Sequence, residues 1–145
     1  MSVLLVLAAA VMPAGLEATV RAFYADIARA DNADPLWTRA LVPSVRALEK
    51  RVTAASTGDV PDYLDADWLC QCQDPAGLKI ASLASAPGPS GTTIVTVRFG
   101  VEGRATDRVW LVMVRDHGWK IADVIDKSGM RYTYALRYNL RPHRR

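Results

Sequence analysis

The segment from residue 92 to residue 124 constrains the fold more than any other part of the chain. Its first part, up to residue 101, alternates apolar and polar residues, as in a strand with one buried face. Residues 108 to 115 are apolar on both faces, which is typical of a central strand covered on each side. Asp116-His117-Gly118 then predicts a hairpin turn into a strand from Trp119 to Val124, because glycine readily adopts the positive φ of tight turns. An antiparallel sheet is therefore expected.

Helices are predicted before this sheet. An apolar stripe at helical spacing runs to about Ala30 and consists of Leu16, Val20, Phe23 and Ile27. Asp34-Pro35 indicates the start of a second helix, with the carboxylate as its cap. Pro43 lacks an amide donor, so this helix is expected to kink or restart near Ser44. Two further elements are expected: a strand at 78–84, and a closing helix from Tyr132 to Leu140.

The order of these elements predicts an α+β fold, in which N-terminal helices pack on a strongly bent antiparallel sheet that forms a cone. A chain of 145 residues with 50% hydrophobic content suits one domain, which we place at residues 16–140. The net charge of +3 is too small to predict nucleic-acid binding. Part of it lies in a basic tail at residues 141–145.

Residues 1–15 have the outline of a signal peptide. Residues 3–12 carry no charge, and Pro13 and Gly15 separate them from the first amphipathic stripe. The alternative is a buried N-terminal helix or strand. The run is shorter than the roughly 20 apolar residues of a membrane-spanning helix, so no transmembrane segment is expected after processing. These features favour a periplasmic or secreted protein.

Two motifs carry a family resemblance. They are Asp67-Trp68-Leu69-Cys70-Gln71-Cys72-Gln73-Asp74 and Gly118-Trp119-Lys120-Ile121-Ala122-Asp123-Val124, in which Gln73-Asp74 and Trp119-x-Ile121-x-Asp123 are the most specific parts. Over residues 16–140 the chain resembles the bacterial family called domain of unknown function 3828, whose members look like the nuclear-transport-factor-2-like, or cystatin-like, α+β cone. Members are exported or lipid-anchored, but this chain lacks a lipobox cysteine. The resemblance implies no particular activity, because this fold serves enzymes and non-enzymes alike.

Cys70 and Cys72 leave several alternatives open. In Cys-x-Cys spacing they can bind a soft metal, exchange disulfides, remain partly buried thiols or form a short-loop disulfide. A tetrahedral metal site needs more ligands, and His117 in a turn and His143 in the tail are poorly placed to supply them. We therefore expect no metal and no cofactor, and the pair to be dispensable for function.

Candidate site residues are few. Asp123 and Asp74 are the carboxylates available for acid–base chemistry, but a strand-end role for Asp123 and a turn-capping role for Asp74 are favoured, so no catalytic residue is predicted. Tyr24, Trp110 and Trp119 are candidates for lining a ligand pocket, although aromatic residues at such positions are more often simple core.

These observations favour a non-catalytic binding domain, monomeric or homodimeric, for a protein partner or a small apolar ligand. One alternative is a cone enzyme of the isomerase, cyclase or dehydratase type, which needs an ionisable group inside the cone. Another is an immunity or inhibitor protein that binds its target through the acidic loop, with Asp67, Gln73 and Asp74 as the interaction residues.

Overall fold

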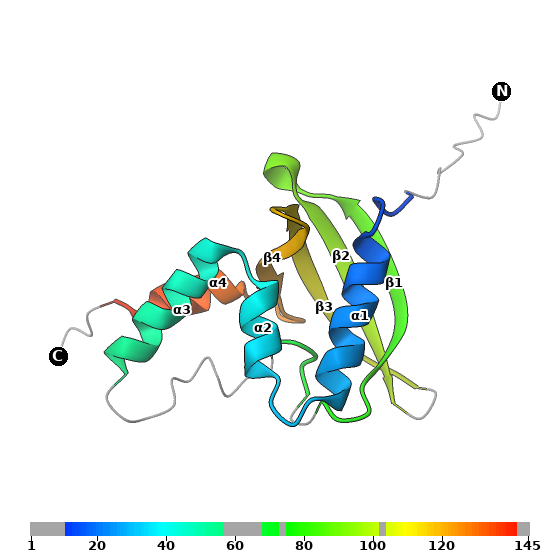
Figure 1. The fold of residues 1–145 in the computed structure, drawn as a ribbon, viewed down its shortest axis with the longest axis horizontal. Helices are drawn as coiled ribbons and strands as arrows, with labels where there is room; N and C mark the ends of the chain where they lie inside the picture. Colours follow the sequence, from blue (N-terminus) through cyan, green and yellow to red (C-terminus); the bar gives the residue numbers. More distant parts are fainter. Residues whose placement is uncertain (1–10, 57–67, 73–74, 102–103, 142–145) are drawn as a thin grey trace.

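A computed structural model describes residues 11–56, 68–72, 75–101 and 104–141 of the chain (Figure 1). The helices and strands are α1 (Leu16–Arg29), α2 (Asp34–Ala40), α3 (Pro43–Ala55), β1 (Lys79–Pro87), β2 (Thr93–Val101), β3 (Arg104–Arg115), β4 (Trp119–Ile125) and α4 (Tyr132–Asn139). A single 3-10 turn, η2 (Pro89–Gly91), separates β1 from β2. The predicted α+β class, with N-terminal helices on an antiparallel sheet, is confirmed.

The four strands form one open sheet in the order β1-β2-β3-β4, and each neighbouring pair is antiparallel. All three pairings contain a register shift, the last of them between Val112 and Met113. Such bulges bend a strand and increase its twist, so they account for the bent sheet. At the β3–β4 hairpin, His117 and Gly118 have φ angles of 52° and 101°. This turn therefore has the positive φ that the sequence predicted.

Helix α1 crosses one face of the sheet (Figure 1). Its buried residues are Leu16, Val20, Tyr24 and Ile27. The predicted stripe placed Phe23 at the third position, but Tyr24 is the buried residue there and Phe23 packs at the margin of the core. Both positions lie close to the inner face of the helix. Tyr24 is the one that is buried because its hydroxyl donates a hydrogen bond to the Leu69 carbonyl.

The break between α2 and α3 is part of the sheet architecture. Leu41 forms a parallel bridge with Ile121 of β4, and the Val42 amide donates to the Ile121 carbonyl at 2.9 Å. Pro43 then begins α3, where a missing amide costs nothing. The prediction that Asp34 caps α2 was wrong, because Asp34 is already helical and its own amide donates to the Asn32 carboxamide oxygen at 3.0 Å.

Strand β3 is less enclosed than predicted. Leu111 and Met113 face α1 and are buried, and Val112 on the opposite face is only 5% exposed. However, Trp110 and Val114 are half-buried, so the second face of this strand is only partly covered. Helices α3 and α4 pack against each other beside the sheet rather than over that face (Figure 1).

The N-terminal residues before α1 contact the folded domain. Met12 packs against the core, and the Ala14 carbonyl accepts hydrogen bonds from Trp119 Nε1 and Arg115 Nη2, both at 3.1 Å. Residues on the N-terminal side of the predicted domain boundary, between residues 15 and 16, therefore touch the folded domain. The signal-peptide assignment stays a prediction, and residues 1–10 lie outside the described part. Among the described helices, none has both the length and the apolar character needed to cross a membrane.

Candidate functional site

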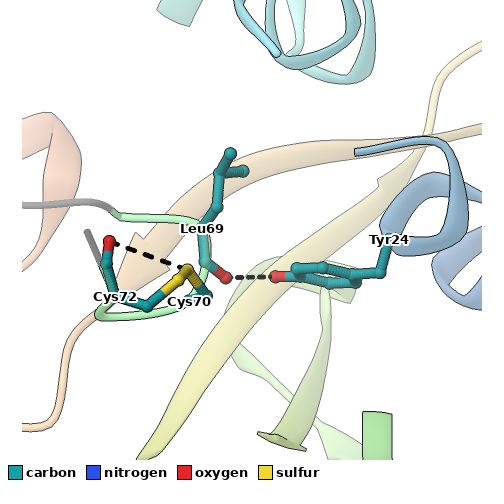
Figure 2. Close-up of a disulfide and its surroundings, with 4 residues drawn as sticks. All are labelled: Tyr24, Leu69, Cys70 and Cys72. Atoms are coloured by element: carbon teal, nitrogen blue, oxygen red, sulfur yellow. Dashed lines mark hydrogen bonds between the residues drawn. A yellow bond between two sulfur atoms is a disulfide. The ribbon is translucent and has the colours of Figure 1, made fainter. Parts of the chain in front are cut away.

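Cys70 and Cys72 form a disulfide in a short segment beside the sheet (Figure 2). Of the alternatives that the sequence left open, the structure shows the short-loop disulfide. Cys70 is 1% exposed and Cys72 is half-buried. Gln71 between them has a φ of 55°, in the left-handed region that L residues rarely adopt. Within the described residues, no group of three or more His, Cys, Asp or Glu side chains is arranged to hold a metal ion.

Tyr24 anchors this segment to α1. Its hydroxyl donates to the Leu69 carbonyl at 2.7 Å, as Figure 2 shows, and its ring packs edge-on against Phe99 of β2 at 5.1 Å. Trp68, Leu69 and Cys70 are all buried in the same core. Tyr24 therefore joins two distant parts of the chain and does not line a described pocket.

The other predicted pocket residues lie apart. Trp119 lines a cavity of about 20 Å³ between α1 and the sheet, together with Ile121 and Met113. That volume has room for about one water molecule. Trp110 does not line it; its ring lies under the Arg108 guanidinium at 4.7 Å. Among the pockets of the described residues, none is therefore lined by all three aromatic residues named from the sequence.

Hydrogen bonds join Asp123 of β4 to the start of α4. The residue is 6% exposed, and its Oδ1 accepts hydrogen bonds from the amides of Val124 at 2.9 Å and Thr133 at 3.0 Å. Its Oδ2 accepts from the Thr133 hydroxyl at 2.9 Å and lies 3.5 Å from Arg131 Nη1. Because Thr133 is in the first turn of α4, this carboxylate satisfies an amide that a helix start leaves without an intrahelical partner.

Of the remaining residues named from the sequence, the structure describes only His117. Asp67, Gln73, Asp74 and His143 lie outside the described residues. His117 lies exposed in the β3–β4 turn, with Nδ1 2.9 Å from its neighbour Asp116. The acidic-loop interaction site therefore stays a prediction.

Sequence reasoning missed Glu49 on α3. Its Oε1 accepts a hydrogen bond from Trp37 Nε1 at 2.7 Å and another from the Tyr132 hydroxyl. The Tyr132 ring packs against Trp37 at 5.5 Å and against Trp68 at 5.2 Å. Glu49 also lines an open hollow of about 740 Å³ between α2 and α3. Only the spatial meeting of α2, α3 and α4 reveals this carboxylate, because nothing in the local sequence marks it.

Sequence reasoning also missed the outer side of α4. We call the group formed by Tyr134, Arg137, Tyr138 and Arg141 the α4 face. Tyr134 is 48% and Tyr138 54% exposed, and their stacked rings have centroids 6.4 Å apart. The Arg141 guanidinium lies 5.9 and 5.8 Å from the two ring centroids.

Helical spacing gathers Tyr134, Arg137 and Tyr138 on one side of α4, while Tyr132 and Leu136 are buried on the opposite side. Arg141 follows the end of α4, and its guanidinium lies over both tyrosine rings. No ion pair among the described residues involves Arg137 or Arg141. The spacing was readable from the sequence, but Arg141 was assigned to the basic tail at residues 141–145.

Comparisons of the chain with family models, with curated proteins and with solved structures find no match. The family resemblance stays a prediction that rests on two motifs. One of them, Trp119-x-Ile121-x-Asp123, forms most of β4. The other, Gln73-Asp74, lies outside the described residues.

Proposed function

We propose that this protein is a non-catalytic binding domain that recognises a protein partner through the α4 face. One observation carries the proposal. The large apolar side chains exposed in the described residues are Val11, Met130, Tyr134 and Tyr138, and three of these four lie on α4 or just before it. Tyr, Met and Arg are enriched in protein interfaces, and Tyr and Arg supply many of their energetic hot spots.

The charge of the α4 face favours an acidic partner surface. Arg137 lies in the last turn of α4 and Arg141 follows the end of that helix, and no described ion pair gives either of them a carboxylate. A guanidinium stacked on an aromatic ring keeps its edge donors, which match a carboxylate in a bidentate pair. The complementary surface therefore presents Asp or Glu around an apolar patch that covers Tyr134 and Tyr138.

The cavity between α1 and the sheet, in the described part of the chain, favours a protein partner over a small apolar ligand. The cavity between α1 and the sheet has about 20 Å³, while pockets for drug-sized ligands have about 300–1,000 Å³. Asp123, the acid–base candidate on the sheet, has both carboxylate oxygens engaged with α4. These features weigh against the enzyme alternative in this part of the fold.

A second candidate, a small-ligand site, is favoured by Glu49. Its carboxylate is held by two neutral donors at the edge of the hollow between α2 and α3, which has Arg46 and Lys50 in its lining. Such a lining suits a polar ligand that carries both a positive and a negative charge. Titration of free amino acids and peptides, monitored by NMR, tests this; shifts confined to α2 and α3 that Glu49→Gln abolishes are expected for this candidate.

We also propose that the protein acts in the periplasm or outside the cell. Disulfides form and persist in oxidising compartments, and the pattern of residues 1–15 is that of an export signal. Mass spectrometry of the chain recovered from its native cells tests this. A mature form that begins within a few residues of Leu16 supports export, and an intact Met1 in a cytoplasmic fraction contradicts it.

The partner proposal is tested with a library of random displayed peptides. Peptides selected on the wild-type protein are expected to be rich in Asp and Glu. Their affinity is expected to fall at least tenfold in a Tyr134→Ser/Tyr138→Ser variant, because hot-spot truncations cost more than the roughly 1.4 kcal/mol of a tenfold change. The matched control changes two exposed residues that lie outside both candidate sites, Arg51→Ser in α3 and Lys79→Ser in β1, and is expected to bind like wild type.

Three results would overturn this proposal. The first is selection of peptides that bind wild type and the tyrosine variant equally. The second is binding of wild-type protein to anionic lipid vesicles that the tyrosine changes abolish, because the face would then recognise a membrane. The third is a concentration-dependent dimer that the same changes dissociate, because the occupant would then be a second copy of the chain.

A further inference from the structure

We propose that the Cys70–Cys72 disulfide is a site of thiol–disulfide exchange with a partner dithiol, and that it is not a structural cross-link. This inference is independent of the α4 face. It rests on the position of the bond in the chain, on the backbone of Gln71 and on the unequal burial of the two cysteine residues.

The bond joins residues two apart in the sequence. It therefore connects no two helices or strands of the fold. A disulfide stabilises a protein mainly by restricting the unfolded chain, and the restriction is smallest for the shortest loops. A ring of three residues gains little in this way, so stabilisation does not account for the bond.

The ring also contains an unfavourable backbone conformation. Gln71 has a φ of 55°, and the left-handed region is disfavoured for an L residue with a full side chain. Reduction opens the ring and allows Gln71 to relax toward an ordinary conformation. Since a disulfide closed at a conformational cost is easier to reduce, the equilibrium is displaced toward the dithiol.

Burial assigns different roles to the two sulfurs. Cys72 is half-buried, whereas Cys70 is 1% exposed. A thiolate of the partner dithiol attacks Cys72 Sγ, the S–S bond breaks, and Cys70 Sγ leaves as a thiolate that takes up a proton. The partner's second thiolate then attacks the partner sulfur of the mixed disulfide and releases Cys72 as a thiolate, which is protonated in turn. Two electrons pass to the Cys70–Cys72 pair, and the partner becomes a disulfide.

The surroundings hold Cys70 in place, which favours re-formation of the disulfide. The Leu69 carbonyl next to Cys70 accepts the 2.7 Å hydrogen bond from Tyr24, and Trp68 and Leu69 are buried in the core. Opening the ring removes none of these contacts. Cys70 therefore stays positioned for Cys72 to reclose on it.

The test uses the full chain, whose only cysteines are this pair. The protein is equilibrated in mixtures of reduced and oxidised dithiothreitol, and the fraction of disulfide is read from the mass added by a thiol-alkylating reagent. Reduction is expected while near-ultraviolet circular dichroism still reports native packing. A pair that stays oxidised until the protein unfolds would be a structural disulfide, and the proposal would be rejected.

Variants at Gln71 test whether the positive φ of this residue makes the disulfide easier to reduce. Gln71→Gly removes the cost of positive φ and is expected to shift the equilibrium toward the disulfide by about fivefold, since 1 kcal/mol corresponds to about that factor. Gln71→Ala keeps a side chain and is the matched control, with an expected equilibrium close to wild type. Equal equilibria for the glycine and alanine variants would remove the conformational argument.

Single-cysteine variants test the direction of attack. Cys70→Ser leaves the half-buried Cys72 thiol, and Cys72→Ser leaves the buried Cys70 thiol. Cys70→Ser is expected to form a mixed disulfide with oxidised glutathione at least tenfold faster. The opposite order would overturn the assignment of Cys72 as the attacked sulfur.

Discussion

Replacing Asp123 with alanine is expected to lower the free energy of unfolding by about 3 kcal/mol. The substitution removes the acceptor for the amides of Val124 and Thr133 and for the Thr133 hydroxyl. A buried donor without a partner costs about 1–3 kcal/mol. We take about 1 kcal/mol for each donor of the half-buried Thr133, which water can reach, and the same value as a minimum for the amide of the buried Val124. The partly exposed Arg131 pair at 3.5 Å adds little.

Asp126 provides the matched control. Its Oδ1 also accepts three hydrogen bonds, from the amide and hydroxyl of Ser128 and from the Met130 amide. Those donors lie in an exposed turn, where water replaces the lost acceptor, so Asp126→Ala is expected to cost about 1 kcal/mol or less. Asp123→Asn, which keeps one acceptor oxygen, is expected to fall between the two alanine variants.

Urea unfolding followed by tryptophan fluorescence measures these differences, with an unchanged dependence on denaturant as the check that each variant unfolds as one unit. Equal losses for Asp123→Ala and Asp126→Ala would refute the reasoning. In that case the Asp123 carboxylate would not hold α4 against β4, and its buried position would need a functional explanation.

The remaining stability predictions use the same unfolding assay. Trp119→Ala is expected to cost about 3 kcal/mol, at the low end for large aromatic residues in a core because Trp119 is only half-buried. Lys120→Ala is expected to cost less than about 1 kcal/mol because its hydrogen bond to a backbone carbonyl is exposed; equal losses for the two variants would mean that the register of β4 is wrong. A chain that begins at Met12 is expected to unfold like the full chain, and a loss of more than about 1 kcal/mol would show that the residues before it pack on the fold. Changing Cys70 and Cys72 together to Ser is expected to cost at most about 1.5 kcal/mol, the chain-entropy value for a three-residue loop, and a larger loss would make the bond structural.

Much of the fold was readable because its signals are local. The alternation in β2, the turn before Trp119 and the proline that begins α3 each follow from a few adjacent residues. The predictions were wrong where the burial of a residue depends on parts of the chain that are distant in the sequence. Burial of Tyr24 in place of Phe23 follows from a carbonyl 45 residues away, and the partial exposure of Trp110 depends on where α3 and α4 pack.

The candidate sites were harder to predict for the same reason. The hydrogen bonds of Glu49 come from residues 12 and 83 positions away, so no local pattern identifies it. The α4 face was different. The spacing of Tyr134, Tyr138 and Arg141 was visible, but its meaning depended on knowing that the opposite side of the helix is buried.

The central claim is that the α4 face pairs its arginines with carboxylates of a protein partner, and a double-mutant cycle tests it most directly. The affinity of a selected acidic peptide is measured for wild type and Arg141→Gln, and again for both with the peptide's Asp and Glu changed to Asn and Gln. A direct pair predicts that the two losses do not add, with a coupling of about 1 kcal/mol or more. Additive losses, or an affinity that Arg141→Gln leaves unchanged, would contradict the account.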